Sequence, residues 1–219
     1  MNSKINIKPT TVNCEPSTII VANGKFPEHE IPLNLLHKAE IVVCCDGAIA
    51  KLDKNGIEPT IIVGDLDSLS DNYRSRFAAK LSHDPDQNTN DLTKAIKWCK
   101  SNNLSNIYIL GATGIREDHT LGNIGLLPSY ARMGMQIRLI TDNGVIIPLI
   151  QSSTLESFKG QQISIFSPNN LTRITTTNLK YPIVNSTLDE LWMGTLNESL
   201  GDTFTIEFNP GPLILFQSY

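Results

Sequence analysis

Five apolar runs of strand length punctuate the first two thirds of the chain, at residues 17–22, 41–45, 60–63, 107–110 and 136–140. Near-continuous apolar runs of this length are typical of parallel strands that are covered on both faces. Helical stretches lie between them. The pattern therefore predicts an α/β domain built on an open, mostly parallel sheet with flanking helices.

The clearest helix is predicted for residues 91–100, with Asn90 as a typical N-cap. Helical spacing places four residues on one apolar face: Leu92, Ala95, Ile96 and Cys99. Three lysines are expected away from that face: Lys94, Lys97 and Lys100.

After the turn signal at residues 142–144, short strands follow one another without helices between them. They are expected at residues 145–149, 162–166, 173–177, 203–208 and 213–216. Closely spaced strands of this kind predict a small all-β, sandwich-like domain. The domain boundaries predicted from this change are 1–143 for the α/β part and 144–219 for the β part.

Composition narrows the class of protein. With 219 residues and 40% hydrophobic content, the chain is long enough for a sizeable core. Its apolar runs are shorter than the ~20 residues that a membrane-spanning helix needs. The first residues lack an apolar signal region, so a cytoplasmic location is expected.

The charge distribution argues against a nucleic-acid-binding protein, and the cysteine spacing argues against a zinc site or a disulfide framework. The net charge of −4 comes without a basic stripe, so nucleic acid is not expected as a partner. The four cysteines, Cys14, Cys44, Cys45 and Cys99, contain no C-x-x-C pair, and buried free thiols are predicted.

Acidic residues gather at the ends of two predicted strands. Asp65 and Asp67 directly follow one of them, and Asp46 follows another. Because the carboxyl ends of parallel strands meet at one edge of a sheet, these carboxylates are expected to reach a common ion. Mg²⁺ usually takes one or two carboxylates and substrate phosphates, so the pattern indicates phosphate chemistry. A structural alternative makes Asp65 and Asp67 turn residues, with Ser68 capping the next helix.

Two further segments suit phosphate. Asp91 opens the predicted helix, where backbone N–H groups favour a phosphate or a metal-bridged phosphate, although Asp91 as a plain helix stabiliser stays open. A glycine-containing loop at residues 111–114 precedes a helix that is expected to begin near Asp118. Arg116 can pair bidentately with phosphate oxygens, and Asp118 can orient its guanidinium or hold metal.

Four segments carry a family resemblance: Cys45-Asp46-Gly47-Ala48, residues 64–68, residues 86–91 and residues 111–119. In this order and spacing they resemble the thiamine pyrophosphokinase family, whose pattern is roughly D-G-A, G-D-x-D-S, D-Q-D-x-T-D and G-G-R-x-D-H. The resemblance runs from about residue 45 to 123 and recurs weakly around 179–198. The chain departs from the pattern at Asn88, Asn90, Ile115 and Leu196.

The resemblance implies transfer of a diphosphoryl group from ATP to the hydroxyl of thiamine, with Mg²⁺, by a homodimer that shares its active sites between subunits. The implied metal ligands are Asp46, Asp65, Asp67 and Asp91. The implied catalytic residues are Asp65, Asp67, Asp91, Arg116 and Asp118. The implied nucleotide-binding or phosphate-binding residues are Asp46, Gly47, Gln87, Asn88, Thr89, Gly111, Thr113 and Gly114. In the β-domain, Tyr181 is expected to stack on thiamine and Asn197 to hydrogen-bond its pyrimidine, with Trp192 as another candidate platform.

Two other functions remain open. A metal-dependent glycosyltransferase also places Asp-x-Asp after an apolar strand, but it does not predict the later cluster or the Arg116 and Asp118 pair. A non-catalytic thiamine or nucleotide sensor would keep the pocket and lose turnover, and the departures at Asn88, Ile115 and Leu196 favour it. The many retained carboxylates argue against a sensor.

Overall fold

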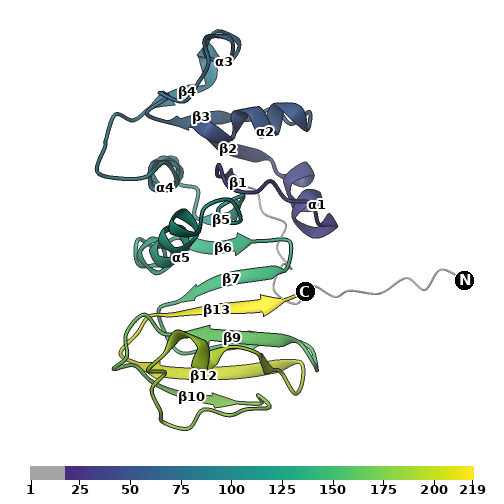
Figure 1. The fold of residues 1–219 in the computed structure, drawn as a ribbon, viewed down its shortest axis with the longest axis vertical. Helices are drawn as coiled ribbons and strands as arrows, with labels where there is room; N and C mark the ends of the chain where they lie inside the picture. The colour runs from purple at the N-terminus through teal and green to yellow at the C-terminus, as the bar shows by residue number, and fades with distance from the viewer. Residues whose placement is uncertain (1–17) are drawn as a thin grey trace, which may run out of the picture. The chain divides into compact units, whose positions relative to one another are not determined.

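The computed structural model describes residues 18–219, which fall into two compact units that divide between Asp142 and Asn143. The first unit contains the helices and the parallel strands, and the second contains the antiparallel strands (Figure 1).

A parallel sheet forms the framework of the first unit. Its strand order is β6-β5-β1-β2-β3-β4, and every neighbouring pair is parallel. This confirms the predicted open parallel sheet. The strands are β1 (Thr18–Val21), β2 (Ile41–Cys45), β3 (Ile61–Gly64), β4 (Leu81–His83), β5 (Asn106–Leu110) and β6 (Gln136–Ile140).

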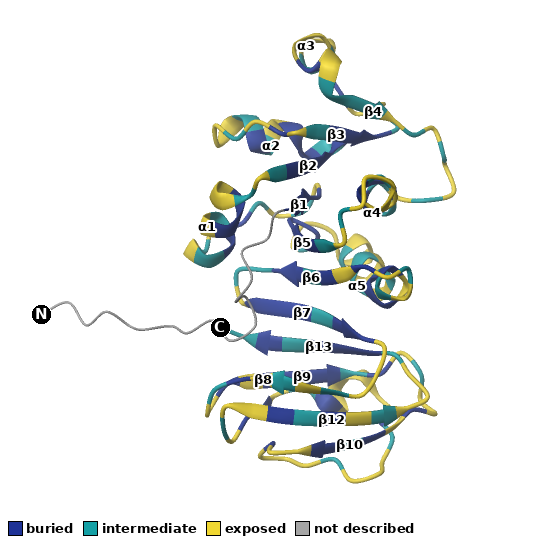
Figure 2. Cartoon of the chain, turned by 180° about the vertical axis from the view of Figure 1, so that it is seen from behind, coloured by how far each residue is buried: buried dark blue, intermediate teal, exposed yellow. Residues whose placement is uncertain are grey.

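Helices cover both faces of this sheet. Figures 1 and 2 show α1 and α2 on one face and α4 and α5 on the other. The central strands are therefore buried: β1 over its whole length and β5 in all residues but its first, as the colours in Figure 2 show. The helices are α1 (Glu30–Lys38), α2 (Ile49–Lys54), α3 (Asp71–Arg76), α4 (Asp91–Ser101) and α5 (Glu117–Arg132), with short 3₁₀ turns at Asp46–Ala48 and Ala78–Lys80.

Side-chain caps mark the first residues of α3 and α4. The Asn90 side chain accepts the Thr93 N–H at 2.9 Å, which confirms Asn90 as the N-cap of α4. In α3 the cap is Ser70, whose hydroxyl accepts the Tyr73 N–H. The alternative in which Ser68 caps this helix is therefore wrong, because the helix begins two residues later than that alternative requires.

The second unit contains a run of four antiparallel sheet strands, in the order β11-β9-β13-β7, and a separate three-stranded antiparallel sheet, β10-β12-β8. Residues from both sheets share one apolar core, which includes Ile163, Ile174, Phe204 and Leu215. The predicted sandwich-like β-domain is confirmed. Its elements are β7 (Gly144–Leu149), β8 (Ser153–Glu156), β9 (Gln162–Phe166), β10 (Arg173–Thr177), β11 (Asn197–Glu198), β12 (Thr203–Asn209), β13 (Leu213–Ser218) and a 3₁₀ turn at Leu191–Gly194.

Other expectations can be compared directly. Cys44, Cys45 and Cys99 are buried free thiols, as predicted, whereas Cys14 and Ser17 lie outside the described residues. Across residues 18–219, none of the helices has the length and apolar character needed to cross a membrane.

Candidate active site

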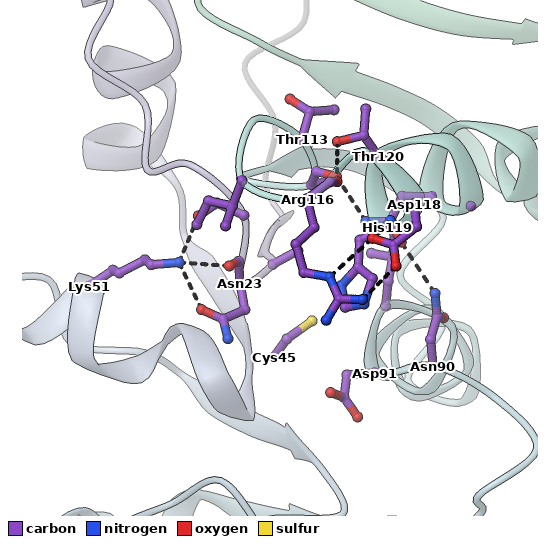
Figure 3. A pocket seen from close by; sticks show the side chains of 17 residues that line it. Asn23, Cys45, Lys51, Asn90, Asp91, Thr113, Arg116, Asp118, His119 and Thr120 are labelled. Atoms are coloured by element: carbon purple, nitrogen blue, oxygen red, sulfur yellow. Dashed lines mark hydrogen bonds and ion pairs between the residues drawn. The ribbon is translucent and has the colours of Figure 1, made fainter.

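A cavity of about 510 Å³ opens at the carboxyl ends of β1, β2 and β5 (Figure 3). Its walls include Asn23 after β1, Cys45 at the end of β2 and Thr113 after β5. In the sheet, β1 lies between β2, which follows it directly in the chain, and β5, which comes only after β4. The strand order therefore reverses beside β1, and open α/β sheets bind ligands at such switch points.

Backbone hydrogen bonds join the loops after β1 and β5. The Gly24 N–H donates to the Gly111 carbonyl at 2.5 Å, and the Lys25 N–H donates to the Thr113 carbonyl at 2.7 Å. A Cβ on Gly24 would lie 2.5 Å from the Thr113 oxygen, and Gly111 has φ +65°. Glycine at both positions therefore lets the loops approach closely and form one wall of the cavity.

Lys51 and Asn23 complete this wall, and the sequence interpretation missed both. The Lys51 ammonium donates 2.7 Å hydrogen bonds to the Asn23 carbonyl, the Asn23 side-chain oxygen and the Gly24 carbonyl, as drawn in Figure 3. Burial lowers the pKa of Lys51. Because all three acceptors are uncharged, Lys51 brings a positive charge to the cavity wall. The signal that would have revealed Asn23 is its position directly after an apolar strand, as for Asp46.

Asp46 is buried at the carboxyl end of β2. The residue is 2% exposed, and its Oδ1 accepts the Gly47 N–H at 2.6 Å. The other carboxylate oxygen makes no hydrogen bond of normal geometry to the described residues, although the Ser68 side chain is close enough to lower the pKa of Asp46. A Cβ on Gly64 would lie 2.7 Å from Asp46 Cγ, so the glycine that ends β3 makes room for this carboxylate. Burial raises the pKa of Asp46, and the negative charge of Asp91 raises it further.

Lys94 joins two of the predicted carboxylates. Its ammonium lies 3.2 Å from Asp91 Oδ1 and 3.6 Å from Asp65 Oδ2. The sequence placed Lys94 away from the apolar face of α4 and did not anticipate its burial, since its side chain is only 2% exposed. It is buried by packing toward the strand exits rather than by the apolar stripe. The pKa of Lys94 is raised because the bond and charge of Asp91, with the charge of Asp65, outweigh burial.

The carboxylates suit a hard cation chemically. Within residues 18–219, no set of three or more His, Cys, Asp or Glu side chains is arranged so that it could hold a metal ion by itself. Asp46 nevertheless offers a buried oxygen without a partner, and the charges of Asp91 and Asp65 both raise its pKa. Oxygen donors of this kind are those that Mg²⁺ prefers. These three residues therefore have the donor chemistry that the implied ion needs, although they are not gathered into a three-ligand site, and the Lys94 ammonium contacts two of them.

Asp67 and the segment before α4 have fewer contacts with the other predicted carboxylates. The Asp67 residue is exposed, and its backbone N–H donates to Asp65 Oδ1 at 3.1 Å, which is the main reason that the pKa of Asp65 is lowered. The Gln87 amide contacts Asp65 Oδ2 at 3.4 Å. Asn88 and Thr89 bond instead to Asp86, through the Asn88 N–H at 2.9 Å and the Thr89 hydroxyl at 3.0 Å. The structure thus brings Gln87 toward the carboxylates and uses Asn88 and Thr89 to shape the loop.

Arg116 and Asp118 form a bidentate ion pair at the mouth of the cavity. The two guanidinium nitrogens lie 3.1 Å and 2.5 Å from the two oxygens of Asp118. Both side chains are more than half exposed and line the cavity. The hydrogen bond from Arg116 lowers the pKa of Asp118 to about 2. Gly114, with φ +87°, donates its N–H to the Thr120 hydroxyl and so connects the loop to α5.

The predicted thiamine residues lie in the second unit. Tyr181 is 60% exposed and lines a second cavity of about 380 Å³, whose wall includes Asn197 and Leu196. Asn197 is buried: its side-chain oxygen accepts the N–H groups of Tyr181 and Glu198, and its amide donates to the Tyr181 carbonyl at 2.7 Å. The structure therefore uses Asn197 to position Tyr181. Trp192 is 73% exposed, so it is a surface residue and not part of the core.

Two family models match the chain. The thiamin pyrophosphokinase catalytic domain matches residues 33–139, and the thiamin pyrophosphokinase substrate-binding domain matches residues 144–216. The chain belongs to the thiamin pyrophosphokinase family. The catalytic-domain match includes the carboxylates, Lys94 and Arg116, and the substrate-binding match includes Tyr181.

Individual thiamine pyrophosphokinases are similar over most of their length. The protein of Bacillus subtilis (strain 168) is 31% identical over 183 residues, covering 78% of this chain and 84% of the relative. Thiamine pyrophosphokinase 1 of Oryza sativa subsp. japonica is 30% identical over 205 residues, covering 78% and 75%. The Bacillus subtilis crystal structure superposes with a TM-score of 0.76 at 27% identity, covering 92% of this chain and 98% of that one. The Candida albicans structure, at a TM-score of 0.75 and 20% identity over 92% and 89%, shows the shared fold.

Proposed function

We propose that this chain transfers a diphosphoryl group from ATP to the hydroxyl of thiamine, giving thiamine diphosphate and AMP in a Mg²⁺-dependent reaction. The observation that carries the proposal is the switch-point cavity, which Asp91 lines, together with the Lys94 contacts that join Asp91 to Asp65. Membership of the thiamin pyrophosphokinase family supports the same reaction. Diphosphoryl transfer asks the protein mainly to position its substrates and neutralise charge, which is what charged side chains around such a cavity provide.

The carboxylates supply the cation site in this proposal. Asp46, Asp65 and Asp91 would hold Mg²⁺, with Asp67 reaching it from the loop after β3. When bound, the ion neutralises charge on the phosphates. Asp46 is the donor with an unpartnered buried oxygen, so it has most to gain from a cation. One of these carboxylates would also accept the proton of the thiamine hydroxyl.

Arg116 would stabilise the charge of the transferred group. Its guanidinium is 64% exposed at the cavity and is held by Asp118, so it can exchange carboxylate oxygens for phosphate oxygens of similar geometry. The backbone around Gly111, Thr113 and Gly114 would line the phosphate path from the same loop. Lys51, which donates a hydrogen bond to Asn23, adds positive charge to the cavity wall.

Thiamine is proposed to bind through the second unit. Tyr181 presents an exposed ring that can stack on a flat heterocycle, and Asn197 holds its backbone in place. Leu196 stands where the family often has serine and is 70% exposed with φ +58°. It would contribute an apolar contact in place of a hydroxyl.

A homodimer with active sites shared between subunits is part of the proposal. Large apolar side chains are exposed in residues 181–200, among them Leu191, Trp192 and Leu196 at 61%, 73% and 70%. Apolar surface of this kind favours a protein contact. A monomer at working concentration by light scattering would contradict this part. A cytoplasmic location is also proposed, and the free thiols of Cys44, Cys45 and Cys99 are usual for proteins of a reducing compartment.

Product analysis tests the proposal. Purified protein with ATP, thiamine and Mg²⁺ should release AMP and thiamine diphosphate in equal amounts, and omitting thiamine or the divalent ion should stop both. A glycosyltransferase would leave these substrates unchanged and turn over a sugar nucleotide. A sensor would bind thiamine or nucleotide in calorimetry and form no product. Either of these results would overturn the proposed reaction.

A further inference from the structure

A buried lysine contacts the carboxylate cluster from within the protein. The side chain of Lys94 is 2% exposed, whereas the two carboxylates that it contacts, Asp65 and Asp91, are 26% and 41% exposed. The ammonium therefore approaches the cluster from the protein side and leaves the carboxylates open toward the solvent. Burying an ammonium is costly unless it is paired, and here two acidic partners compensate for that cost.

The partners of Lys94 come from different parts of the chain. Asp65 follows β3, and Asp91 lies in the first turn of α4, as Lys94 itself does three residues later. Asp46 follows β2, and the negative charges of both carboxylates raise its pKa. Without a cation, three negative groups at this edge of the sheet would repel one another. The Lys94 ammonium reduces their summed formal charge from −3 to −2.

We propose that Lys94 is a built-in counter-cation that holds Asp65 and Asp91 together before any divalent ion arrives and prevents tight binding of that ion without nucleotide. The inference rests on the proposed function only in naming a divalent ion and a nucleotide as ligands. Lys94 is a positioning residue in this account, since it acts through the carboxylates. A divalent ion that arrives with nucleotide brings phosphate oxygens as additional ligands, so it depends less on the protein carboxylates.

The proposal predicts that the bare divalent ion binds weakly and that tight binding requires nucleotide. A bare divalent ion meets carboxylates that are already partly neutralised and an ammonium that repels it. The arrangement of the described side chains agrees, since no three acidic, His or Cys groups there form a ready metal site. Removing the ammonium while keeping the aliphatic chain should therefore make the cluster a stronger site for the bare ion.

The test measures Mn²⁺ binding without nucleotide or thiamine, by electron paramagnetic resonance of the free ion. Lys94→Met should bind Mn²⁺ about tenfold more tightly than the wild type, because the substitution removes a positive charge that contacts two of the proposed ligands, Asp65 and Asp91. The matched control is Lys97→Met, which removes an ion-paired lysine from the same helix. Lys97 lies 3.3 Å from Asp86 and is 46% exposed, so its loss should change Mn²⁺ affinity less than twofold. Lys94→Arg keeps the charge and should also stay within twofold of the wild type.

Each result decides the inference. Unchanged or weaker Mn²⁺ binding by a folded Lys94→Met variant would overturn it, and so would equal tightening by Lys97→Met. If Lys94→Met does not fold, the wild type still provides a test: it should bind Mn²⁺ alone only at concentrations on the order of 1 mM. Binding in the micromolar range would overturn the inference. Because none of these measurements involves turnover, a failure to form AMP would refute the proposed function while leaving this result interpretable.

Discussion

Asp46→Asn should stabilise the protein at neutral pH. The residue is 2% exposed, and its carboxylate has one oxygen without a partner and is close enough to Asp91 and Asp65 for their charges to raise its pKa. Asparagine keeps the size of the side chain and the oxygen that accepts the Gly47 N–H. It also removes the buried charge that the neighbouring Asp91 and Asp65 disfavour. Leaving a buried polar group unsatisfied costs roughly 1–3 kcal/mol, so a gain of about that size is expected.

The pH dependence gives the sign of the effect. The folded-state pKa of Asp46 is raised, so its protonated form stabilises the native state below the ordinary carboxyl pKa, and this stabilisation is lost as the pH rises through the raised value. The advantage of Asp46→Asn should therefore be full at pH 7 and should disappear as the pH falls below about 3.9.

The assay is thermal unfolding followed by circular dichroism between acidic and neutral pH, without divalent ions. For a chain of this length, each kcal/mol should raise the Tm by about 2–4 °C. Asp142→Asn is the matched contrast, because Asp142 Oδ1 accepts the N–H groups of Glu28 and His29 at 2.8 and 2.9 Å. The pKa of Asp142 is lowered despite partial burial, so the same substitution there should destabilise at pH 7. A lower Tm for Asp46→Asn at pH 7 would refute the reasoning about the unpartnered oxygen.

Three further substitutions test the site. Asp91→Asn keeps a residue compatible with the first turn of α4 but removes a proposed ligand, so AMP release should fall to background while the circular dichroism spectrum is unchanged; normal turnover would make Asp91 purely structural. Gly64→Ala places a Cβ 2.7 Å from Asp46 Cγ and should cost about 1–3 kcal/mol in urea unfolding together with activity, and a wild-type unfolding midpoint would contradict the close approach. Asp118→Asn releases Arg116 and should raise the KM for ATP. Because the pKa of Asp118 is about 2, wild-type kcat/KM should show no titration of this pair near neutral pH.

The fold could be predicted because its strands are apolar and long enough to be recognised. Residues 41–45 and 136–140 are strands over their whole predicted length. Residues 41–45 are apolar on both faces, as a central parallel strand requires, whereas in 136–140 the polar Gln136 and Arg138 alternate with buried Ile137 and Leu139. The strand Leu81–His83 was missed because it is short, polar and at the sheet edge. Asn197–Glu198 has only two residues, which is too few for any periodic signal.

The candidate site was predicted less completely than the fold. Asp46, Asp65 and Asp91 were recognisable because each stands at a strand exit or helix start. Lys94 was missed because helical periodicity describes a single buried face, whereas the first turn of α4 is also covered on the side of the strand exits. Its spacing of three residues after Asp91 was the available signal. The Asn197 side chain hydrogen-bonds to the backbone N–H and carbonyl of Tyr181. These bonds join residues 16 positions apart, so sequence spacing did not reveal them.

The fate of the two terminal phosphates of ATP tests the central claim most directly. Wild-type protein would be incubated with thiamine, Mg²⁺ and ATP that is isotopically labelled at both the β- and γ-phosphorus, and the products would be separated and identified. If the cavity, the carboxylates and Arg116 hold the terminal phosphates as one transferred unit, both labels should appear in thiamine diphosphate and the AMP should be unlabelled. Recovery of the β-label in ADP, with only the γ-label on thiamine, would contradict the account.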